Sequence, residues 1–403
     1  MRRYKAKIIT NNATITRIIT ASNLENAKEI LSSSGEIIAI SEESKVGLGA
    51  KFRRIDSGVL AIYIRQIGTL MEAGVSVLEA FSSVAQGCHN PILRKILDDI
   101  SSDLHSGLSL EQALSGFKSE LGAVSVAMFA LGQNSGRLPE ALFMLSDMLN
   151  EMAENRAKFK RALRYPMIVL LSLIIAFNLL IVMVVPSFAG VFAAIGGELP
   201  LATRILLGLE SFIASYGFLA LFGIILIGFL IWYFYRFNSK FRIKFDNFLL
   251  KIPLLKGLIL YGSLTKFSLI LSRLISAGMS IDKAINIANG VVENSYISSK
   301  IAFVAMDIHS GQTLSKAFEG AHLYEKIAIE IIKAGQTSGV IDEMFAHVSK
   351  FYKQKYDTLI DGLNGSLEPV LLIAIAGAVL LLGLGIFMPL WELSSGSGLY
   401  RFI

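Results

Sequence analysis

Three stretches of this sequence lack charged residues for long enough to cross a lipid bilayer. They run from about Met167 to Val185, from Tyr216 to Tyr235 and from Val370 to Met388. A transmembrane helix needs about 20 apolar residues, because each residue adds a rise of about 1.5 Å. The composition agrees, since 17% of the 403 residues are charged, against roughly a quarter in soluble domains. The sequence therefore predicts a polytopic membrane protein with three spans.

Basic residues mark one side of these stretches. Lysine and arginine are frequent before the first stretch, after the second and before the third, whereas the 187–212 connector holds only Arg204 and the C-terminal tail only Arg401. By the positive-inside rule, the N-terminus and the segment 236–366 face the cytoplasm, while the 187–212 loop and the C-terminus lie outside. No apolar core follows the basic start of the chain, so we expect no cleavable signal peptide.

The chain contains an internal repeat. Ala73-Gly-Val-Ser-Val recurs 204 residues later as Ala277-Gly-Met-Ser-Ile, and Gly132-Gln-Asn-Ser-Gly recurs 203 residues later as Gly335-Gln-Thr-Ser-Gly. The prolines that bound the first and third stretches keep the offset of 203 residues: Pro166, Pro186, Pro369 and Pro389. We interpret the chain as a tandem duplication of a cytoplasmic helical domain followed by a span. The single middle span returns the chain to the cytoplasmic side.

Local signals within each copy are helical. Gly74 and Gly278 stand where a helix would end in a left-handed cap. Ser109 with Gln112 forms a capping-box pattern that starts a helix, and the second copy keeps Ser280 as a cap. We therefore expect each copy to fold as a compact antiparallel helix bundle.

The N-terminal segment follows a different pattern. Two β-branched runs, 4–9 and 13–19, flank an Asn-Asn turn, and a helix over 23–31 with a strand over 37–40 would complete a small α+β cap. The predicted fold is thus mostly α. Its predicted parts are the cap (1–40), a linker (41–55), helical domain 1 (56–165), span 1 (166–186), an external loop (187–212), span 2 (213–235), helical domain 2 (236–366), span 3 (367–389) and an external tail (390–403).

The residues offer little catalytic chemistry. No Gly-x-x-x-x-Gly-Lys-Ser/Thr phosphate-binding loop is present, and the five histidines lack the spacing of metal ligands. The spans hold no Asp, Glu, Lys, Arg or His, although an ionisable group inside the membrane is the usual mark of an ion path. We therefore assign no catalytic, cofactor-binding or metal residue and expect no enzyme and no cofactor.

The paired Gly-Gln-x-Ser-Gly motifs are the sharpest local feature. One interpretation is a tight corner between helices, where glycine permits a positive φ and a close backbone approach. The other is a surface for partner docking or dimerisation, and the two are compatible. The candidate residues are Gly132, Gln133, Ser135 and Gly136 in the first copy, and Gly335, Gln336, Ser338 and Gly339 in the second.

The order of these features resembles one family. Tyr4-Lys-Ala, the paired Ala-Gly-x-Ser breaks, Tyr165-Pro166 and Pro186-Ser-Phe, followed by Gly196-Gly-Glu-Leu-Pro, are similar to the platform proteins of type II secretion (protein F) and type IV pilus assembly (protein C). The resemblance covers residues 3–393, and such machines secrete proteins, build pili or take up DNA. Members often carry glutamate where Gln133 and Gln336 stand here, so any role that needs that carboxylate is in doubt.

The resemblance implies a non-enzymatic scaffold in the bacterial inner membrane. It also implies partners: a hexameric cytoplasmic ATPase, a pilin or pseudopilin, other inner-membrane assembly proteins, a second copy of the chain and membrane lipid, with no direct nucleic-acid contact. Two other functions stay open at this point. A membrane-anchored signalling scaffold would also use tandem helical domains, and a small-solute permease would need oligomers to line a pore.

Overall fold

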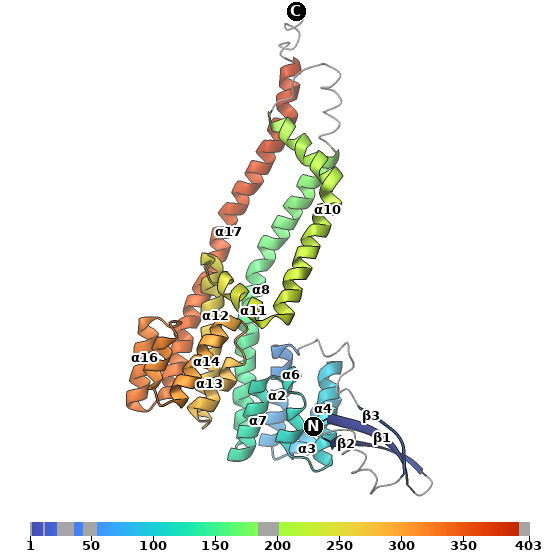
Figure 1. The fold of residues 1–403 in the computed structure, drawn as a ribbon, viewed down its shortest axis with the longest axis vertical. Coiled ribbons are helices and arrows are strands. Elements are labelled where there is room, and N and C mark those ends of the chain that lie inside the picture. The colour runs from blue at the N-terminus through green and yellow to red at the C-terminus, as the bar shows by residue number, and fades with distance from the viewer. Residues whose placement is uncertain (1, 11–12, 22–35, 43–54, 184–200, 395–403) are drawn as a thin grey trace, which may run out of the picture. The chain divides into compact units, whose positions relative to one another are not determined.

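A computed structural model describes residues 2–10, 13–21, 36–42, 55–183 and 201–394. Beyond three N-terminal strands, these residues are mostly helical (Figure 1). They form two compact units, Met1–Asn150 and Glu151–Ile403.

The first unit begins with an antiparallel sheet of order β2-β1-β3. Its strands are β1 (Arg2–Thr10), β2 (Ala13–Ala21) and β3 (Glu36–Glu42), which include the three segments that the sequence predicts as strands. β1 pairs with β2 without a break, and its register against β3 shifts between Lys7 and Ile8. The predicted helix over 23–31 and most of the 41–55 linker lie outside the described residues. The α+β cap as a whole stays a prediction.

Short helices follow the sheet in the first unit. They are α2 (Ser57–Glu72), α3 (Val77–Gly87), α4 (Pro91–His105), α5 (Leu110–Ser115), α6 (Lys118–Leu121), α7 (Ala123–Ser135) and the first turns of α8 (Leu138–Met183). Gly74 follows α2 with a φ of 87°, as predicted. The capping box before α5 is complete. The backbone N–H of Gln112 donates to Ser109 Oγ (3.3 Å), and the backbone N–H of Ser109 donates to Gln112 Oε1 (3.1 Å).

The second unit repeats most of this series of helices. It contains the rest of α8, α10 (Leu201–Phe237), α11 (Ser239–Leu249), α12 (Pro253–Ser276), α13 (Ile281–Asn289), α14 (Ser295–His309), α15 (Leu314–Gly320), α16 (Lys326–Ser338) and α17 (Ile341–Ser394). Both ends of α14 lie 204 residues after those of α4, and both ends of α16 lie 203 residues after those of α7. The duplication predicted from the recurring motifs and prolines thus extends to the limits of these two pairs of helices.

Within the described residues, four helical stretches are long and apolar enough to cross a membrane, judged by length and composition. They are Leu138–Ile181, Arg204–Phe237, Leu255–Ser276 and Ile341–Gly385. The sequence predicts only three spans, and the additional stretch belongs to α12. Half of its most apolar window (50%) is buried, against 6%, 0% and 11% for the other three. It packs against α17 and α13, so its apolar residues form part of a protein core.

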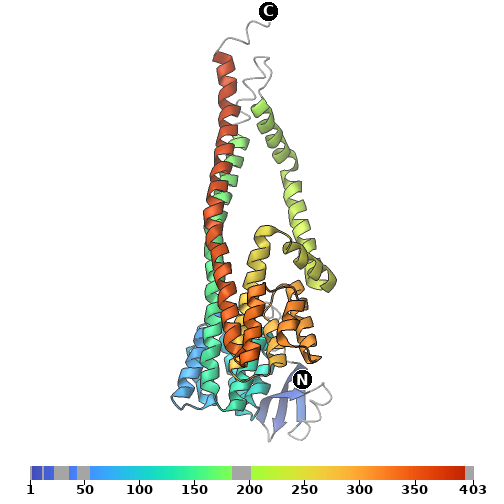
Figure 2. The same ribbon diagram turned by 90° about the vertical axis from the view of Figure 1, so that its left-hand side faces the viewer.

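The helices α8 and α17 continue through the predicted domain boundaries. Figure 2 shows α17 as one continuous helix. Pro166 lies inside α8, and Pro369 and Pro389 lie inside α17. A proline in a helix removes one hydrogen bond and bends the chain, but flanking turns preserve the helix. Pro389 therefore does not end its helix, which runs on to Ser394. Pro186 lies outside the described residues.

Candidate functional site

The first Gly-Gln-x-Ser-Gly motif forms the corner between α7 and α8. Gly136 has a φ of 69° and ends α7 in the left-handed conformation. The Arg137 N–H then donates to the Gly132 carbonyl (3.0 Å), which is the long hydrogen bond of a Schellman cap. A residue with a Cβ atom would be strained at Gly136 because of its positive φ.

Gly132 serves the same corner in another way. A Cβ atom at this position would lie 2.8 Å from Ala141 Cβ and 2.9 Å from Leu138 Cα. Both neighbours belong to the first turn of α8, so the missing side chain allows α7 and α8 to pack in close contact. The two glycines of the motif therefore have separate physical roles: Gly136 permits the turn, and Gly132 permits the approach.

The second motif repeats this geometry between α16 and α17. Gly339 has a φ of 79°, and its N–H donates to the Gly335 carbonyl (2.9 Å). A Cβ atom at Gly335 would lie 2.5 Å from Met344 Cγ and 3.4 Å from Ile341 Cα. Both copies place a Cβ atom in the way, Met344 Cβ at 2.7 Å here and Ala141 Cβ at 2.8 Å in the first copy, but only the first copy has a backbone atom, Leu138 Cα, closer than 3.0 Å.

The polar residues of the two motifs differ in their contacts. Gln336 Oε1 accepts hydrogen bonds from the Ser315 N–H (3.1 Å) and the Ser315 hydroxyl (3.3 Å), which joins α16 to the start of α15. Gln133 is exposed, and Glu111 stands at the position that matches Ser315. Ser135 and Ser338 donate to carbonyls of their own helices, Gly132 at 3.3 Å and Ala334 at 2.8 Å.

A junction between α8 and α17 was missed by the sequence reasoning. Lys158 Nζ lies 3.2 Å from Asp357 and 3.3 Å from Asp361, and Lys353 Nζ lies 2.8 Å from Glu151. Burial acts to lower the pKa of Lys158, but hydrogen bonds to the two aspartates outweigh it and raise the pKa above its usual value. One signal was available, because Lys158 and Asp361 occupy equivalent repeat positions and carry opposite charges.

Apolar packing extends this junction along the helices. Ala162 of α8, Leu258 of α12 and Ile360 of α17 form one buried cluster, against which the Phe159 and Tyr356 rings pack. Two α12 glycines allow close contact with α17, since a Cβ atom would lie 2.5 Å from Leu359 Cδ1 at Gly257 and 3.1 Å from Tyr356 Cε2 at Gly262.

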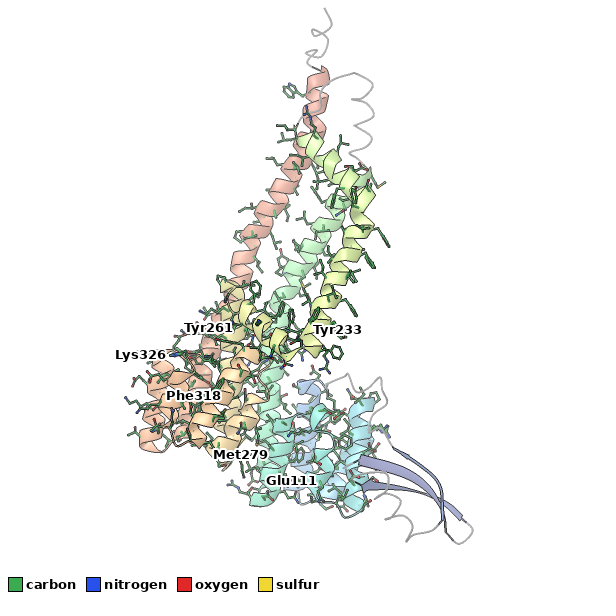
Figure 3. The ribbon with its side chains drawn as sticks, in the orientation of Figure 1. Glu111, Tyr233, Tyr261, Met279, Phe318 and Lys326 are labelled. Carbon is green, nitrogen blue, oxygen red and sulfur yellow. The ribbon has the colours of Figure 1, made fainter. Side chains whose placement is uncertain are left out.

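A second cluster joins the apolar stretches themselves. Ile181 of α8, Leu206 of α10 and Leu382 of α17 are buried together. The rest of α10 is almost entirely exposed, as Figure 3 shows for its side chains, including Tyr233 near its C-terminal end. An exposed and continuous apolar surface of this length is typical of contact with lipid or with another apolar helix.

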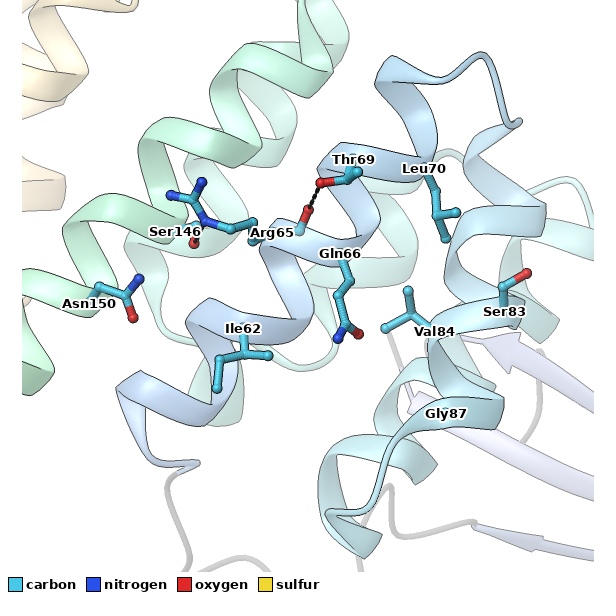
Figure 4. A pocket seen from close by; sticks show the side chains of 10 residues that line it. All are labelled: Ile62, Arg65, Gln66, Thr69, Leu70, Ser83, Val84, Gly87, Ser146 and Asn150. Atoms are coloured by element: carbon cyan, nitrogen blue, oxygen red, sulfur yellow. Dashed lines mark hydrogen bonds between the residues drawn. The ribbon is translucent and has the colours of Figure 1, made fainter.

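The first unit also contains an open groove of about 610 Å³ between α2, α3 and the start of α8 (Figure 4). Ile62 and Leu70 contribute apolar surface, and the Arg65 guanidinium donates to Ser146 Oγ (3.3 Å) and pairs with Asp147. These bonds hold Arg65 against α8. Among the residues that the structure describes, no group of three or more His, Cys, Asp or Glu side chains could hold a metal ion.

Comparison with known proteins places these features in a family. The family model described as type II secretion system (T2SS), protein F, matches the chain twice, over residues 63–186 and 267–389. The type IV pilus assembly protein PilC of Pseudomonas aeruginosa is 27% identical over 355 residues, which cover 88% of this chain and 94% of the relative. PilC of Thermus thermophilus is 27% identical over 385 residues (93% and 94%).

A third relative comes from a secretion machine. The type II secretion system protein F of P. aeruginosa is 28% identical over 355 residues, which cover 88% of this chain and 87% of the relative. The two matched segments begin and end at the repeat offset found in the sequence and in the helices. The chain belongs to the type II secretion system protein F family.

Proposed function

We propose that this chain, an inner-membrane platform protein of a type II secretion or type IV pilus assembly machine, couples a cytoplasmic hexameric ATPase to the assembly of pilin or pseudopilin subunits. It acts as a scaffold, with its chemistry supplied by the ATPase. Family membership supports the platform role. The continuity of two long helices supports the coupling role.

The orientation follows from charge. With both bundles in the cytoplasm, the basic residues that flank the three apolar stretches lie on the cytoplasmic side, as the positive-inside rule requires. The chain then crosses the membrane three times, through α8, α10 and α17, with the N-terminus inside and the C-terminus outside. The half-buried α12 stays within the second bundle.

The single observation that carries the proposal is the continuity of α8 and α17. They contain 46 and 54 residues, which correspond to about 70 Å and about 80 Å of helix at about 1.5 Å per residue. Each starts at a glycine corner and runs through its bundle into an apolar stretch. A displacement applied to a corner is therefore passed to a span without an intervening loop.

The exposed apolar surface supports contact with pilin helices. The most apolar window of α10 has none of its residues buried (0%). In the bilayer, helices associate through packing rather than through the hydrophobic effect, so a long apolar helix such as α10 suits transient contact with a departing pilin helix.

Cysteine crosslinking in native membranes tests the proposal. Asn134→Cys and Thr337→Cys stand at matched, exposed positions in the two corners, and Cys88→Ala removes the native thiol, which is buried. We expect one or both positions to capture the hexameric ATPase, while Ser102→Cys on the outer face of α4 does not. Topology labelling that places both bundles inside, with no ATPase captured from either corner, would contradict the coupling.

A second test addresses the continuity of α8. Arg161 is exposed in the segment between corner and span, and Arg161→Pro removes a helical hydrogen bond at a cost of about 3 kcal/mol. We expect the variant to insert but to assemble few fibres, with Arg161→Ala close to wild type. Normal fibre numbers in an inserted Arg161→Pro protein would show that a continuous helix is not needed.

A further inference from the structure

The second unit contains a pocket of about 530 Å³ at the end of α10. Tyr235 of α10, Phe159 of α8, Leu258 of α12 and Tyr356 of α17 contribute its apolar wall. The volume lies within the range of small-ligand sites, about 300–1,000 Å³. All of its lining residues belong to one unit, and neither the family nor the proposed coupling assigns it a role.

Three cationic side chains line the same pocket. They are Arg156 and Lys160 of α8 and Lys266 of α12. Within the described part of the chain, Arg156 and Lys160 make no hydrogen bond or ion pair, and both are exposed. Lys266 lies 3.6 Å from the carboxylate of Glu293, which is 79% exposed. The pocket therefore presents Arg156 and Lys160 as cations without an acceptor among the described residues, and Lys266 paired only with an exposed carboxylate.

The other carboxylate in the pocket does not neutralise these cations. Asp246 is 2% exposed, and it accepts hydrogen bonds from the Tyr235 hydroxyl (3.1 Å) and the Ser295 N–H (2.6 Å). Its bonds hold α10, α11 and α14 together.

The pocket lies beside the predicted cytoplasmic interface of the membrane. Trp232 and Tyr233 precede Tyr235 at the end of α10, and such aromatic residues mark the membrane interface. Lys160 precedes Pro166 by six residues, which is about 9 Å along α8. Head-group layers add roughly 5–8 Å on each side of the hydrocarbon core, so the Lys160 backbone lies just beyond them and its long side chain can extend toward the lipid phosphates. A ligand in the pocket would thus meet both the interface and the cytoplasmic bundle.

We propose that this pocket binds the phosphate-bearing head group of an anionic phospholipid. Arg156, Lys160 and Lys266 contact the phosphate, and the acyl chains extend along the exposed apolar side of α10. Basic pockets between transmembrane helices on the cytoplasmic side suit this ligand class. The bound lipid would join α8, α10 and α12 at the place where bundle and span meet.

The cations of this pocket are not a by-product of the duplication. Lys266 matches Ile62 in the first copy, and Arg156 and Lys160 match Leu359 and Leu363 in the second. Each cation has an apolar counterpart, so the repeat as such does not require a charge at any of the three positions.

Thermal unfolding of the delipidated full chain in an uncharged detergent tests the proposal. The probes are dioleoylphosphatidylglycerol, dioleoylphosphatidylcholine, sn-glycerol 3-phosphate and inorganic phosphate. We expect only phosphatidylglycerol to raise the Tm, because a ligand that binds the folded state stabilises it. Arg156→Gln/Lys160→Gln should weaken its apparent affinity by about tenfold or more, as expected for the loss of charge-assisted hydrogen bonds.

Lys240→Gln/Lys244→Gln is the matched control. It removes the same charge from exposed residues of α11 that do not line the pocket, and it should keep wild-type affinity. Equal losses in both double variants, or no loss in either, would overturn the proposal. Stabilisation by either soluble phosphate as strong as that by phosphatidylglycerol would overturn the lipid source. The lipid-free Tm verifies folding, and Arg156→Gln alone replaces the double variant if that fails to fold.

Discussion

The two helical repeats share one arrangement of helices but place their large side chains differently. In the first repeat, Phe81 and Phe129 are buried with ring centroids 5.8 Å apart, and the matching residues of the second repeat are Ile285 and Ile332. The aromatic pair of one core is thus an aliphatic pair in the other.

The reverse exchange occurs elsewhere in the same cores. In the second repeat, Phe318 and Phe345 are buried with ring centroids 5.3 Å apart, where the first repeat has the buried residues Leu114 and Leu142. Cores accept such exchanges when the total volume is kept. The comparison teaches that the repeats share the corner glycines and the limits of two pairs of helices, α4 with α14 and α7 with α16, but differ in where the core holds its large side chains.

The largest expected loss of stability comes from removing the buried Phe318 ring. Phe318→Ala should lower the free energy of unfolding of the second repeat by about 3–5 kcal/mol, because the ring is fully buried and leaves a cavity. Leu114→Ala should cost the first repeat about 2–5 kcal/mol. Hydrogen exchange at the amides of α15 and α5 measures the two losses separately. A loss below 1 kcal/mol at Phe318 would mean that the aromatic cluster does not carry the core.

An exchange of the two patterns sharpens this comparison. Phe318→Leu/Phe345→Leu gives the second repeat the leucines of the first and should destabilise it. Adding Ile285→Phe/Ile332→Phe restores the lost volume at the positions used by the first repeat and should recover part of the stability. If the variant with four substitutions is less stable than the variant with two, the Phe81/Phe129 and Phe318/Phe345 positions of the repeats are not interchangeable. The same hydrogen-exchange measurement separates these outcomes.

Substitution of the corner glycines should cause the next largest loss of stability, and the loss should differ between Gly132 and Gly335. Gly132→Ala places a Cβ atom 2.9 Å from Leu138 Cα, whereas at Gly335 the nearest backbone atom, Ile341 Cα, is 3.4 Å away and the closer contacts are with the Met344 side chain. Such overpacking costs about 1–3 kcal/mol, and we expect the larger loss at Gly132. The controls Gly136→Ala and Gly339→Ala should cost about 1–2 kcal/mol each, because both require a positive φ. Equal losses at Gly132 and Gly335, measured by thermal unfolding, would show that the backbone contact is relieved by a small shift of α8.

Local signals made much of this fold predictable from the sequence. The repeat offset, the helix stop at Gly74 and the Ser109–Gln112 capping box all depend on residues close in the chain, and the structure confirms them. The Ser280 cap is only partly right. Ser280 stands at the N-cap of α13 but makes no capping hydrogen bond.

Contacts between distant segments could not be predicted in the same way. The pairing of Lys158 with Asp357 and Asp361 depends on how α8 and α17 pack, and a single sequence contains only weak signals for that. The burial of α12 has a similar cause, since its composition alone suits a membrane span and only its packing against α17 reveals a core helix. The sequence predicts a turn at each corner motif from its two glycines, but the neighbours that Gly132 and Gly335 approach are known only from the structure.

Alkaline pH should destabilise the second repeat more than the first. Burial raises the pKa of Tyr324 and of Tyr352, and the residue that matches Tyr352 in the first repeat is Leu149. An unfolded tyrosine has a pKa of about 10, so above that pH the folded state binds more protons than the unfolded state. Stability is then complete below about pH 10 and falls as the pH rises, by up to about 1.4 kcal/mol per unit for the buried Tyr324.

Thermal unfolding between pH 8 and pH 11 measures this dependence. Tyr324→Phe removes one titrating hydroxyl and should reduce the loss of stability at high pH, with little change at pH 8. The first repeat serves as the internal control when the transitions are followed by hydrogen exchange. An alkaline loss of the same size in both repeats would contradict an origin in the buried tyrosines of the second.

The smallest effect on stability is expected on the outer face of α14. Phe303 and Met306 are 60% and 65% exposed, where α4 of the first repeat has Asp99 and Ser102. Phe303→Asp/Met306→Ser gives α14 the residues of α4 and should change the free energy of unfolding by no more than about 0.5 kcal/mol, because neither side chain is packed. Thermal unfolding checks this, and a larger loss would mean that these two side chains are packed against other protein. A stable variant that assembles fewer fibres would show that the second repeat uses this face within the machine, and that the first repeat, polar at the same place, has a different contact.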